Sequence, residues 1–181
     1  MAFRCFNKGI SDFKGIVFGK VTGDFNCSYN SLTSLEGCPK EVTGQFDCSY
    51  NNLTSLEFGP KEVGGDFICY DNNLTSLEFG PKEVGGDFDC SSNNLTSLEF
   101  GPKEIGGDFY CLGNNLTSLE GCPKEVGGDF YFGRNEGVSS EVLKVIFRKM
   151  LGSKLDYSDV LKSLWKDIPI EDKTLLYTPV S

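Results

Sequence analysis

The stretch GDFDCSSNNLTSLEFGPKEIG, residues 86–106, decides the fold, because near copies of it fill most of the chain. The copies begin at Gly23, Gly44, Gly65, Gly86 and Gly107, and a truncated sixth copy begins at Gly128, so the period is 21 residues. A unit of this length cannot bury its own apolar side chains and must stack on its neighbours. The sequence therefore predicts a repeat solenoid.

Within one copy, the spacing of the apolar residues predicts which side chains face inward. Phe88 and Cys90 lie two residues apart, so on a strand both point to the same side, which we place in the core. Leu95 and Leu98 face inward after the strand, and the amide of Asn93 is expected to bond backbone groups where the chain leaves it. We expect a parallel β-sheet on one side of the solenoid and irregular chain on the convex side.

Eight cysteines raise the alternative of a secreted disulfide scaffold. Five of them share one repeat column: Cys27, Cys48, Cys69, Cys90 and Cys111. We expect these to be buried free thiols, because cysteine behaves as a small apolar residue in protein cores. The chain has no histidine and no CxxC pair, so the sequence predicts neither a metal site nor a cofactor.

The run Phe-x-Cys-x-x-Asn-x-Leu-x-x-Leu fits the leucine-rich-repeat consensus, with Phe and Cys in the first two apolar slots. The tail NNLTSLE followed by proline is similar to the short bacterial subclass. The shared pattern VGGDFxCSxNNLTSLEGCPKEVGGDF resembles the leucine-rich-repeat-like proteins encoded by large tailed bacteriophages. The resemblance covers residues 23 to about 135, and it implies a leucine-rich-repeat-like fold and an infected bacterial cell as the setting.

The two ends of the chain differ from the repeats. Residues 1–22 contain Phe3 and Cys5, which echo the repeat strand, and we interpret them as a degenerate N-terminal capping repeat. Residues 23–137 hold five 21-residue repeats and the truncated sixth. Apolar residues at helical spacing in residues 138–181 predict an α-helical C-terminal cap, and a helix that docks a partner is the alternative.

Charge and composition exclude several classes of function. The formal net charge is −9, and residues 23–133 hold 5 lysines against 18 acidic residues, so direct nucleic-acid binding is disfavoured. Acidic residues recur in every repeat and do not converge on one pocket, so we predict no enzyme. The first residues contain no signal peptide and the chain has no long apolar run, which predicts a cytoplasmic protein without membrane contact. If the chain is phage-encoded, this is the host cytoplasm.

One acidic column runs along the expected sheet and is interrupted only by Gln45. It consists of Asp24, Asp66, Asp87, Asp108 and Asp129. Like charges in line repel unless something caps them. Two interpretations stay open: the carboxylates bind a basic partner, or each accepts hydrogen bonds from local turn amides.

The copies vary mainly at positions that point outward from the strand. We identify the following residues as a partner-binding set on the concave face: Asp47, Tyr50, Ile68, Tyr70, Asp71, Asp89, Tyr110, Leu112, Tyr131 and Arg134. Aromatic and apolar anchors of this kind dominate protein interfaces. Neutral drift at solvent positions is the alternative.

Together these patterns predict a non-enzymatic protein-binding module. The phage resemblance implies that the partner is a host protein, with a defence protein among the candidates, which binding inhibits or redirects. The alternatives are an acidic DNA mimic that occupies a nucleic-acid-binding protein, a structural component of a virion or adhesin, and a self-assembling structural piece.

Overall fold

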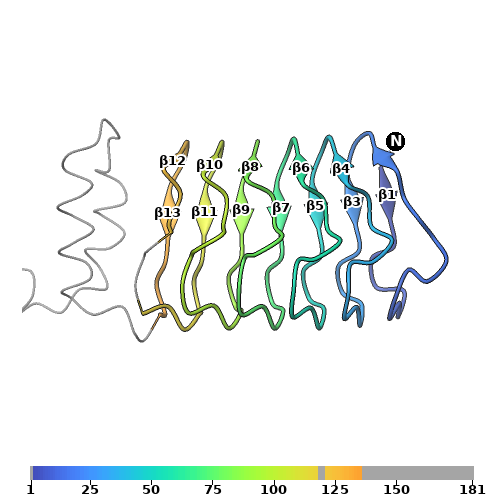
Figure 1. Cartoon of the computed structure of the whole chain (residues 1–181), viewed down its shortest axis with the longest axis horizontal. Helices are drawn as coiled ribbons and strands as arrows, with labels where there is room; N and C mark the ends of the chain where they lie inside the picture. Colours follow the sequence, from blue (N-terminus) through green and yellow to red (C-terminus); the bar gives the residue numbers. More distant parts are fainter. Residues whose placement is uncertain (1, 118–120, 136–181) are drawn as a thin grey trace, which may run out of the picture.

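The computed structural model describes residues 2–117 and 121–135, which form a parallel β-solenoid of about 6 turns (Figure 1). Two parallel sheets run along it. The seven-stranded sheet contains β1 (Phe3–Arg4), β3 (Phe25–Asn26), β5 (Phe46–Asp47), β7 (Phe67–Ile68), β9 (Phe88–Asp89), β11 (Phe109–Tyr110) and β13 (Phe130–Tyr131). The six-stranded sheet contains β2 (Lys20–Val21), β4 (Glu41–Val42), β6 (Glu62–Val63), β8 (Glu83–Val84), β10 (Glu104–Ile105) and β12 (Glu125–Val126). The predicted repeat solenoid with a parallel sheet is confirmed.

Each turn of the solenoid is here called a rung. Every strand pairs with the equivalent strand of the next rung, so equivalent positions of successive repeats lie side by side. Phe25 pairs with Phe46, and Phe3 pairs with Phe25, so the first residues add a strand to the end of the seven-stranded sheet. Hydrogen bonds between rungs extend past the short strands, and the Cys27 amide donates to the Asp47 carbonyl at 2.8 Å. The 21-residue period thus sets the register of the whole sheet.

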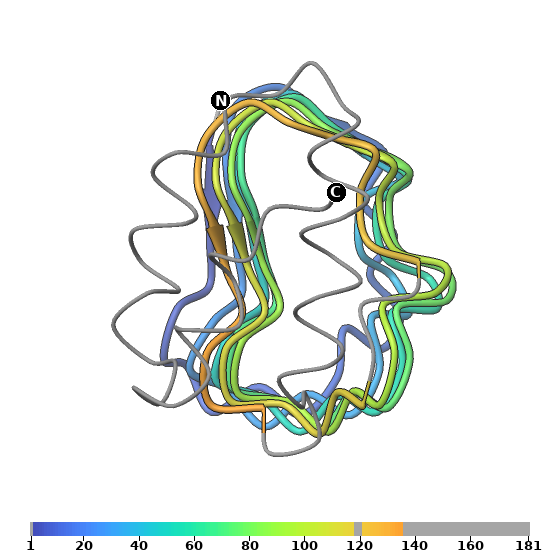
Figure 2. The ribbon, with the colours of Figure 1, turned by 90° about the vertical axis from the view of Figure 1, so that its left-hand side faces the viewer.

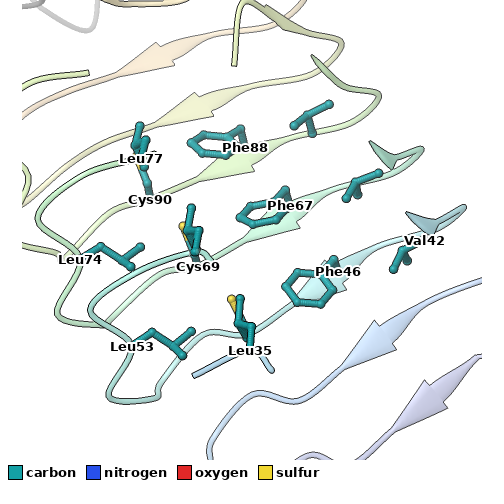
Figure 3. Close-up of a cluster of buried hydrophobic side chains, with 14 of the residues drawn as sticks. Leu35, Val42, Phe46, Leu53, Phe67, Cys69, Leu74, Leu77, Phe88 and Cys90 are labelled. Carbon is teal, nitrogen blue, oxygen red and sulfur yellow. The ribbon is translucent and has the colours of Figure 1, made fainter. Parts of the chain in front are cut away.

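Stacked columns of identical side chains fill the core. Phe25, Phe46, Phe67, Phe88, Phe109 and Phe130 form one column, with ring centroids 4.8–5.7 Å apart between neighbours. Figure 3 shows Phe46, Phe67 and Phe88 in this column beside the cysteine and leucine columns. Each fully buried Phe or Leu contributes about 1.5–3 kcal/mol, so the core gains stability with every rung. The predicted inward direction of Phe, Cys and Leu is confirmed.

Asparagine side chains join the rungs where the chain leaves the seven-stranded sheet. Asn51 Nδ2 lies 3.0–3.1 Å from the carbonyl oxygens of Cys27, Cys48 and Ser49, and its Oδ1 accepts from the Leu32 amide at 2.9 Å. The same arrangement recurs at Asn72, Asn93, Asn114 and Asn135. Each asparagine therefore bonds its own rung and the preceding one, as its sequence position predicts.

All eight cysteines are free thiols, which confirms the prediction against a disulfide scaffold. Seven of them are buried, and Cys122 is half-buried. Burial raises the pKa of Cys48, Cys69 and Cys90 well above the ordinary value of a thiol. These thiols are therefore neutral packing groups at neutral pH.

The six-stranded sheet corrects the expectation of an irregular convex side. Each rung places one inward valine or isoleucine there, such as Val42 or Val63, beside an outward glutamate. A single apolar residue per rung is too short a pattern to predict a strand from the sequence. The strands form because the rungs stack in register, which places the Gly64 amide 3.0 Å from the Val42 carbonyl oxygen that it donates to. The end-on view in Figure 2 shows rungs that nearly superimpose. Both sheets of the solenoid are β-ladders, and neighbouring strands are equally far apart in the two sheets. The solenoid therefore lacks the curvature that a concave face requires.

The predicted α-helical cap at residues 138–181, and its docking alternative, lie outside the described residues. Within residues 2–117 and 121–135, no helix has the length and apolar character needed to cross a bilayer.

Candidate functional site

The outward side of the seven-stranded sheet, here called the seven-stranded face, carries one line of variable residues in register. Asn26, Asp47, Ile68, Asp89, Tyr110 and Tyr131 follow one another along this line, and all are half-buried. Parallel pairing holds each about 4.8 Å from the next in the hydrogen-bonding direction. A partner lying along the solenoid would contact them in sequence.

An aromatic ladder runs beside this line from the N-terminal turn that contains β1 to the turn that contains β7. Ring centroids are 5.2 Å apart for Phe6 and Tyr29, 4.0 Å for Tyr29 and Tyr50, and 5.0 Å for Tyr50 and Tyr70. Hydrogen bonds with the hydroxyls of Tyr29 and Tyr70 raise the pKa of Tyr50 above its ordinary value. Phe6 and Tyr29 are exposed, at 48% and 46%. The ladder is therefore a pre-ordered apolar strip with hydroxyl groups.

A second aromatic pair lies at the other end of the seven-stranded face. The rings of Tyr110 and Tyr131 stack at 4.7 Å with an interplanar angle of 2°. Their hydroxyls donate to Asp108 Oδ2 at 2.7 Å and to Asp129 Oδ2 at 3.0 Å. These hydrogen bonds to carboxylates are the main reason that the pKa of both tyrosines is raised.

Four of the five aspartates in the acidic column accept a hydrogen bond from a backbone amide of the next rung. Asp66 Oδ1 accepts from the Asp87 amide at 3.0 Å, and Asp87 Oδ1 accepts from the Asp108 amide at 2.8 Å. Asp108 with Asp129, and Asp24 with Gln45, repeat this arrangement. Of the two interpretations left open by the sequence, the structure supports capping of backbone amides, and the amides belong to the neighbouring rung.

The glycine that precedes each of these aspartates makes room for the carboxylate of the rung before. A Cβ atom on Gly107 would lie 2.1 Å from Asp87 Oδ1, and one on Gly86 would lie 2.2 Å from Asp66 Oδ1. No side chain fits at such a distance. The repeated Gly-Asp pair is therefore needed for the carboxylate to reach the next amide.

Asp47 and Asp89 flank Ile68 and use part of their hydrogen-bonding capacity locally. Asp47 Oδ1 accepts from the amide and hydroxyl of Ser49 at 3.0 and 2.6 Å, and Asp89 Oδ1 accepts from the Ser91 amide at 2.8 Å. Burial raises the pKa of Asp89, against the opposing effect of its bonds to Ser91. These two carboxylates are partly structural.

The column that contains Tyr50 has a left-handed backbone in every rung. The φ angle is 54° at Tyr29, 51° at Tyr50, 51° at Asp71, 52° at Ser92 and 57° at Arg134. A bulky residue at such an angle costs of order 1–3 kcal/mol compared with relaxed backbone. The tyrosines in this column therefore lower the stability of the fold.

The structure divides the predicted binding residues into two patches. Tyr50, Ile68, Tyr70 and Asp71 lie near one another on the first rungs, while Tyr110, Leu112, Tyr131 and Arg134 lie on the last. Between the patches, the rung that contains β9 carries Asp89, the buried Ser91 and the half-buried Ser92. Phe6 and Tyr29 are not among the predicted site residues. The strand register aligns Phe6 with Ser28 and Asn7 with Tyr29, so no simple repeat match in the sequence relates the two aromatic residues.

Comparison with protein-family models, with curated proteins and with solved structures found no match. The likeness to phage leucine-rich-repeat-like proteins therefore rests on the motif alone.

Sequence reasoning missed a row of exposed phenylalanines on a different part of each rung. Phe58, Phe79 and Phe100 are 42%, 44% and 53% exposed. The signal was present: the three central copies read EFGPK, whereas the first and fifth read EGCPK with Gly37 and Gly121 at the same position. We call these three residues the phenylalanine ridge.

Each ridge residue occupies a turn position that favours glycine. The Gly59 amide donates to the Leu56 carbonyl at 3.1 Å and Phe58 has φ 67°, which together fit the third residue of a type II turn. The equivalent Gly37 has φ 90°, and the Cys38 amide donates to the Leu35 carbonyl at 2.9 Å. Each ridge phenylalanine thus costs of order 1–3 kcal/mol in backbone strain while exposing apolar surface.

Lysines of the preceding rung lie against the ridge. Lys40 Nζ donates to the Phe58 carbonyl at 2.8 Å and lies 5.5 Å from the centre of its ring. Lys61 makes both contacts with Phe79. Partial burial lowers the pKa of Lys61, helped by its lysine neighbours in the column.

The six-stranded face holds a long groove of about 1380 Å³. Glu83 pairs directly with Glu104, and Glu104 with Glu125, so like charges face one another along it. The described residues include two ion pairs, Arg4–Asp24 and Lys20–Glu41, both near the first rung. Within residues 2–117 and 121–135, no cluster of three His, Cys, Asp or Glu side chains could hold a metal ion.

Proposed function

We propose that the chain is a non-enzymatic protein-binding module that contacts its partner through the seven-stranded face. The aromatic ladder from Phe6 to Tyr70 carries this proposal, because its rings are ordered against one another before any partner binds. Ordered aromatic side chains lose little entropy on binding and are typical anchors of protein interfaces.

The backbone of the ladder argues against neutral drift. Tyr29 and Tyr50 hold left-handed φ angles that Gly113 adopts without strain in a later rung of the same chain. A sequence free to drift would lose the bulky residue at such a position. Retention of two tyrosines there supports selection for an exposed aromatic surface.

Protein binding is favoured over DNA mimicry by the role of the acidic column. One carboxylate oxygen each of Asp24, Asp66, Asp87 and Asp108 accepts from an amide of the next rung. The column therefore has a structural reason to recur that needs no basic partner. If the chain is instead a component of a virion or adhesin, it should copurify with phage particles.

The motif resemblance supports a more specific proposal. The chain is related to the leucine-rich-repeat-like proteins of large tailed bacteriophages, acts in the host cytoplasm, and binds a host protein whose activity it blocks or redirects. A bacterial defence protein is the first candidate to examine.

Capture of partners from bacterial lysate tests the proposal. The variant Tyr29→Ser, Tyr50→Ser, Tyr70→Ser copies the residues of rung four, where Ser91 and Ser92 occupy the same columns, so it should fold as the wild type does. We expect it to lose the captured protein. The matched variant Asp66→Asn, Asp87→Asn, Asp108→Asn should keep it. Loss with the asparagine set and retention with the serine set would instead support DNA mimicry.

A further inference from the structure

The phenylalanine ridge is an exposed apolar row that the proposed function does not use. Its three residues are 42–53% exposed, and each has a positive φ angle that its glycine counterparts adopt freely. The ammonium groups of Lys40 and Lys61 lie over the rings of Phe58 and Phe79, which nevertheless stay 42% and 44% exposed. Strained and exposed phenylalanines at three successive rungs indicate a surface that is covered in the working state.

The N-terminal segment covers the turn at Gly37, and the phenylalanine ridge begins at the next rung. At the equivalent position of the first rung, a Cβ atom on Gly37 would lie 2.4 Å from the Ile16 carbonyl oxygen and 3.0 Å from Phe13 Cβ. The N-terminal segment occupies that site, so only glycine fits. At Phe58 and beyond, the same turn is open to another molecule.

Opposite charges border the two sides of the ridge. Around one rung the exposed side chains follow in the order Glu57, Phe58 and Lys61, because Gly59 and Pro60 between them are buried. Stacking repeats this order along the solenoid. The acidic border is Glu57, Glu78 and Glu99. The basic border is Lys40, Lys61 and Lys82, whose ammonium groups donate to the carbonyls of Phe58, Phe79 and Phe100 in the following rung.

We propose that two copies of the chain associate ridge to ridge about a two-fold axis parallel to the solenoid axis. Such an axis places each phenylalanine against its own equivalent and sets the acidic border of one copy against the basic border of the other. A two-fold axis across the solenoid would set glutamates against glutamates. The arrangement of charges therefore selects a second copy in parallel orientation as the occupant.

The expected dimer is weak. Three half-exposed phenylalanine rings offer about 200–300 Å² of apolar surface per copy. A stable interface buries roughly 800 Å² per partner, so the charged borders must supply the remainder and association should depend on concentration.

Sedimentation velocity of the full chain over a concentration series tests the dimer. We expect a monomer–dimer equilibrium, and the variant Phe58→Gly, Phe79→Gly, Phe100→Gly should weaken it by roughly a hundredfold or more. This variant copies Gly37 and relieves the strained φ angles, so its melting temperature should not fall. The set Phe→Asn at the same positions, which tolerates a left-handed backbone, is a second probe. A wild type that stays monomeric, or a dimer that survives both sets, would overturn the proposal.

A charge exchange tests the orientation. One variant carries Glu57→Lys, Glu78→Lys and Glu99→Lys, and the other carries Lys40→Glu, Lys61→Glu and Lys82→Glu. Each alone should be monomeric, because like charges then face one another, and a mixture of the two should form heterodimers. Self-association of either variant at wild-type strength, or no association in the mixture, would exclude the parallel two-fold arrangement.

The serine set on the aromatic ladder separates this proposal from the protein-binding function. We expect Tyr29→Ser, Tyr50→Ser, Tyr70→Ser to dimerise like the wild type while it loses its captured protein. If that set abolished dimerisation and the glycine set did not, self-association would belong to the seven-stranded face and the ridge proposal would be wrong.

Discussion

The carboxylate of Asp87 accepts a hydrogen bond of 2.8 Å from the backbone amide of Asp108, its own equivalent one rung further along. The bond links two rungs outside the regular strand pairs, and Gly107 is the residue that allows the approach. A charge column that the sequence alone could assign to a partner thus has a structural role. Several predictions about stability depend on such bonds between rungs.

Removal of the Asp87 carboxylate should destabilise the fold through the orphaned Asp108 amide. We expect Asp87→Ala to lower the free energy of unfolding by about 1.5–3 kcal/mol, the usual value for a hydrogen bond to a charged group. Asp87→Asn keeps an acceptor oxygen and should cost less. Urea unfolding measures both, and equal losses would show that the charge matters and the hydrogen bond does not.

Asn72 should matter far more than its neighbour Asn73. The Asn72 amide lies within hydrogen-bond distance of the carbonyls of Cys48, Cys69 and Tyr70, and its Oδ1 accepts from the Leu53 amide. Asn72→Ala leaves buried backbone groups without partners and should cost about 3 kcal/mol or more. Asn73 is exposed, so Asn73→Ala should change stability by roughly 0.5 kcal/mol or less. Similar unfolding midpoints for the two variants would contradict the asparagine ladder.

The cysteine column should be protected from reagents in the folded protein. Thiol-reactive compounds are expected to modify Cys69 and Cys90 only after denaturation, and reductants should leave the melting temperature unchanged. A large drop on reduction would mean that disulfides form after all.

The two cysteines should differ when replaced by serine. Cys90 Sγ lies 3.4 Å from the Tyr110 carbonyl oxygen, so the hydroxyl of Cys90→Ser has an acceptor within reach. Burial of a hydroxyl without a partner costs roughly 1–3 kcal/mol, and we expect Cys69→Ser to show the larger loss. Thermal unfolding of the two variants side by side gives the comparison.

Stability should fall as the pH rises above about 9, the ordinary pKa of the buried thiols. Burial raises their pKa in the folded state, so above this pH the unfolded chain loses thiol protons that the folded chain keeps. The unfolded state then binds fewer protons, and the free energy of unfolding decreases with pH by up to about 1.4 kcal/mol per pH unit and thiol. Cys69→Ala should reduce the slope in a series of melting curves, and an unchanged slope would assign it to other groups.

The core could be predicted from the sequence because every repeat shows again which side chains point inward. Phe88, Cys90, Leu95 and Leu98 recur at fixed spacing in several copies, and a position that is apolar in each must face the shared interior. The same repetition identified Asn93 as a turn residue. It favoured free thiols over disulfides for the cysteine column. It also located Tyr50 and Tyr70 as outward positions, without indicating that their rings touch.

Sequence by itself determined the 21-residue period, the inward columns and the parallel stacking, since these follow from apolar spacing and chain length alone. Only the tertiary structure decided three features: the second sheet at Val42, the bond from Asp87 to Asp108, and the exposure of Phe58 at a glycine-like turn. Each depends on how far one rung lies from the next and on which atoms that distance brings together. A single copy of the repeat carries the residue types, but the distance between rungs exists only after the copies have stacked.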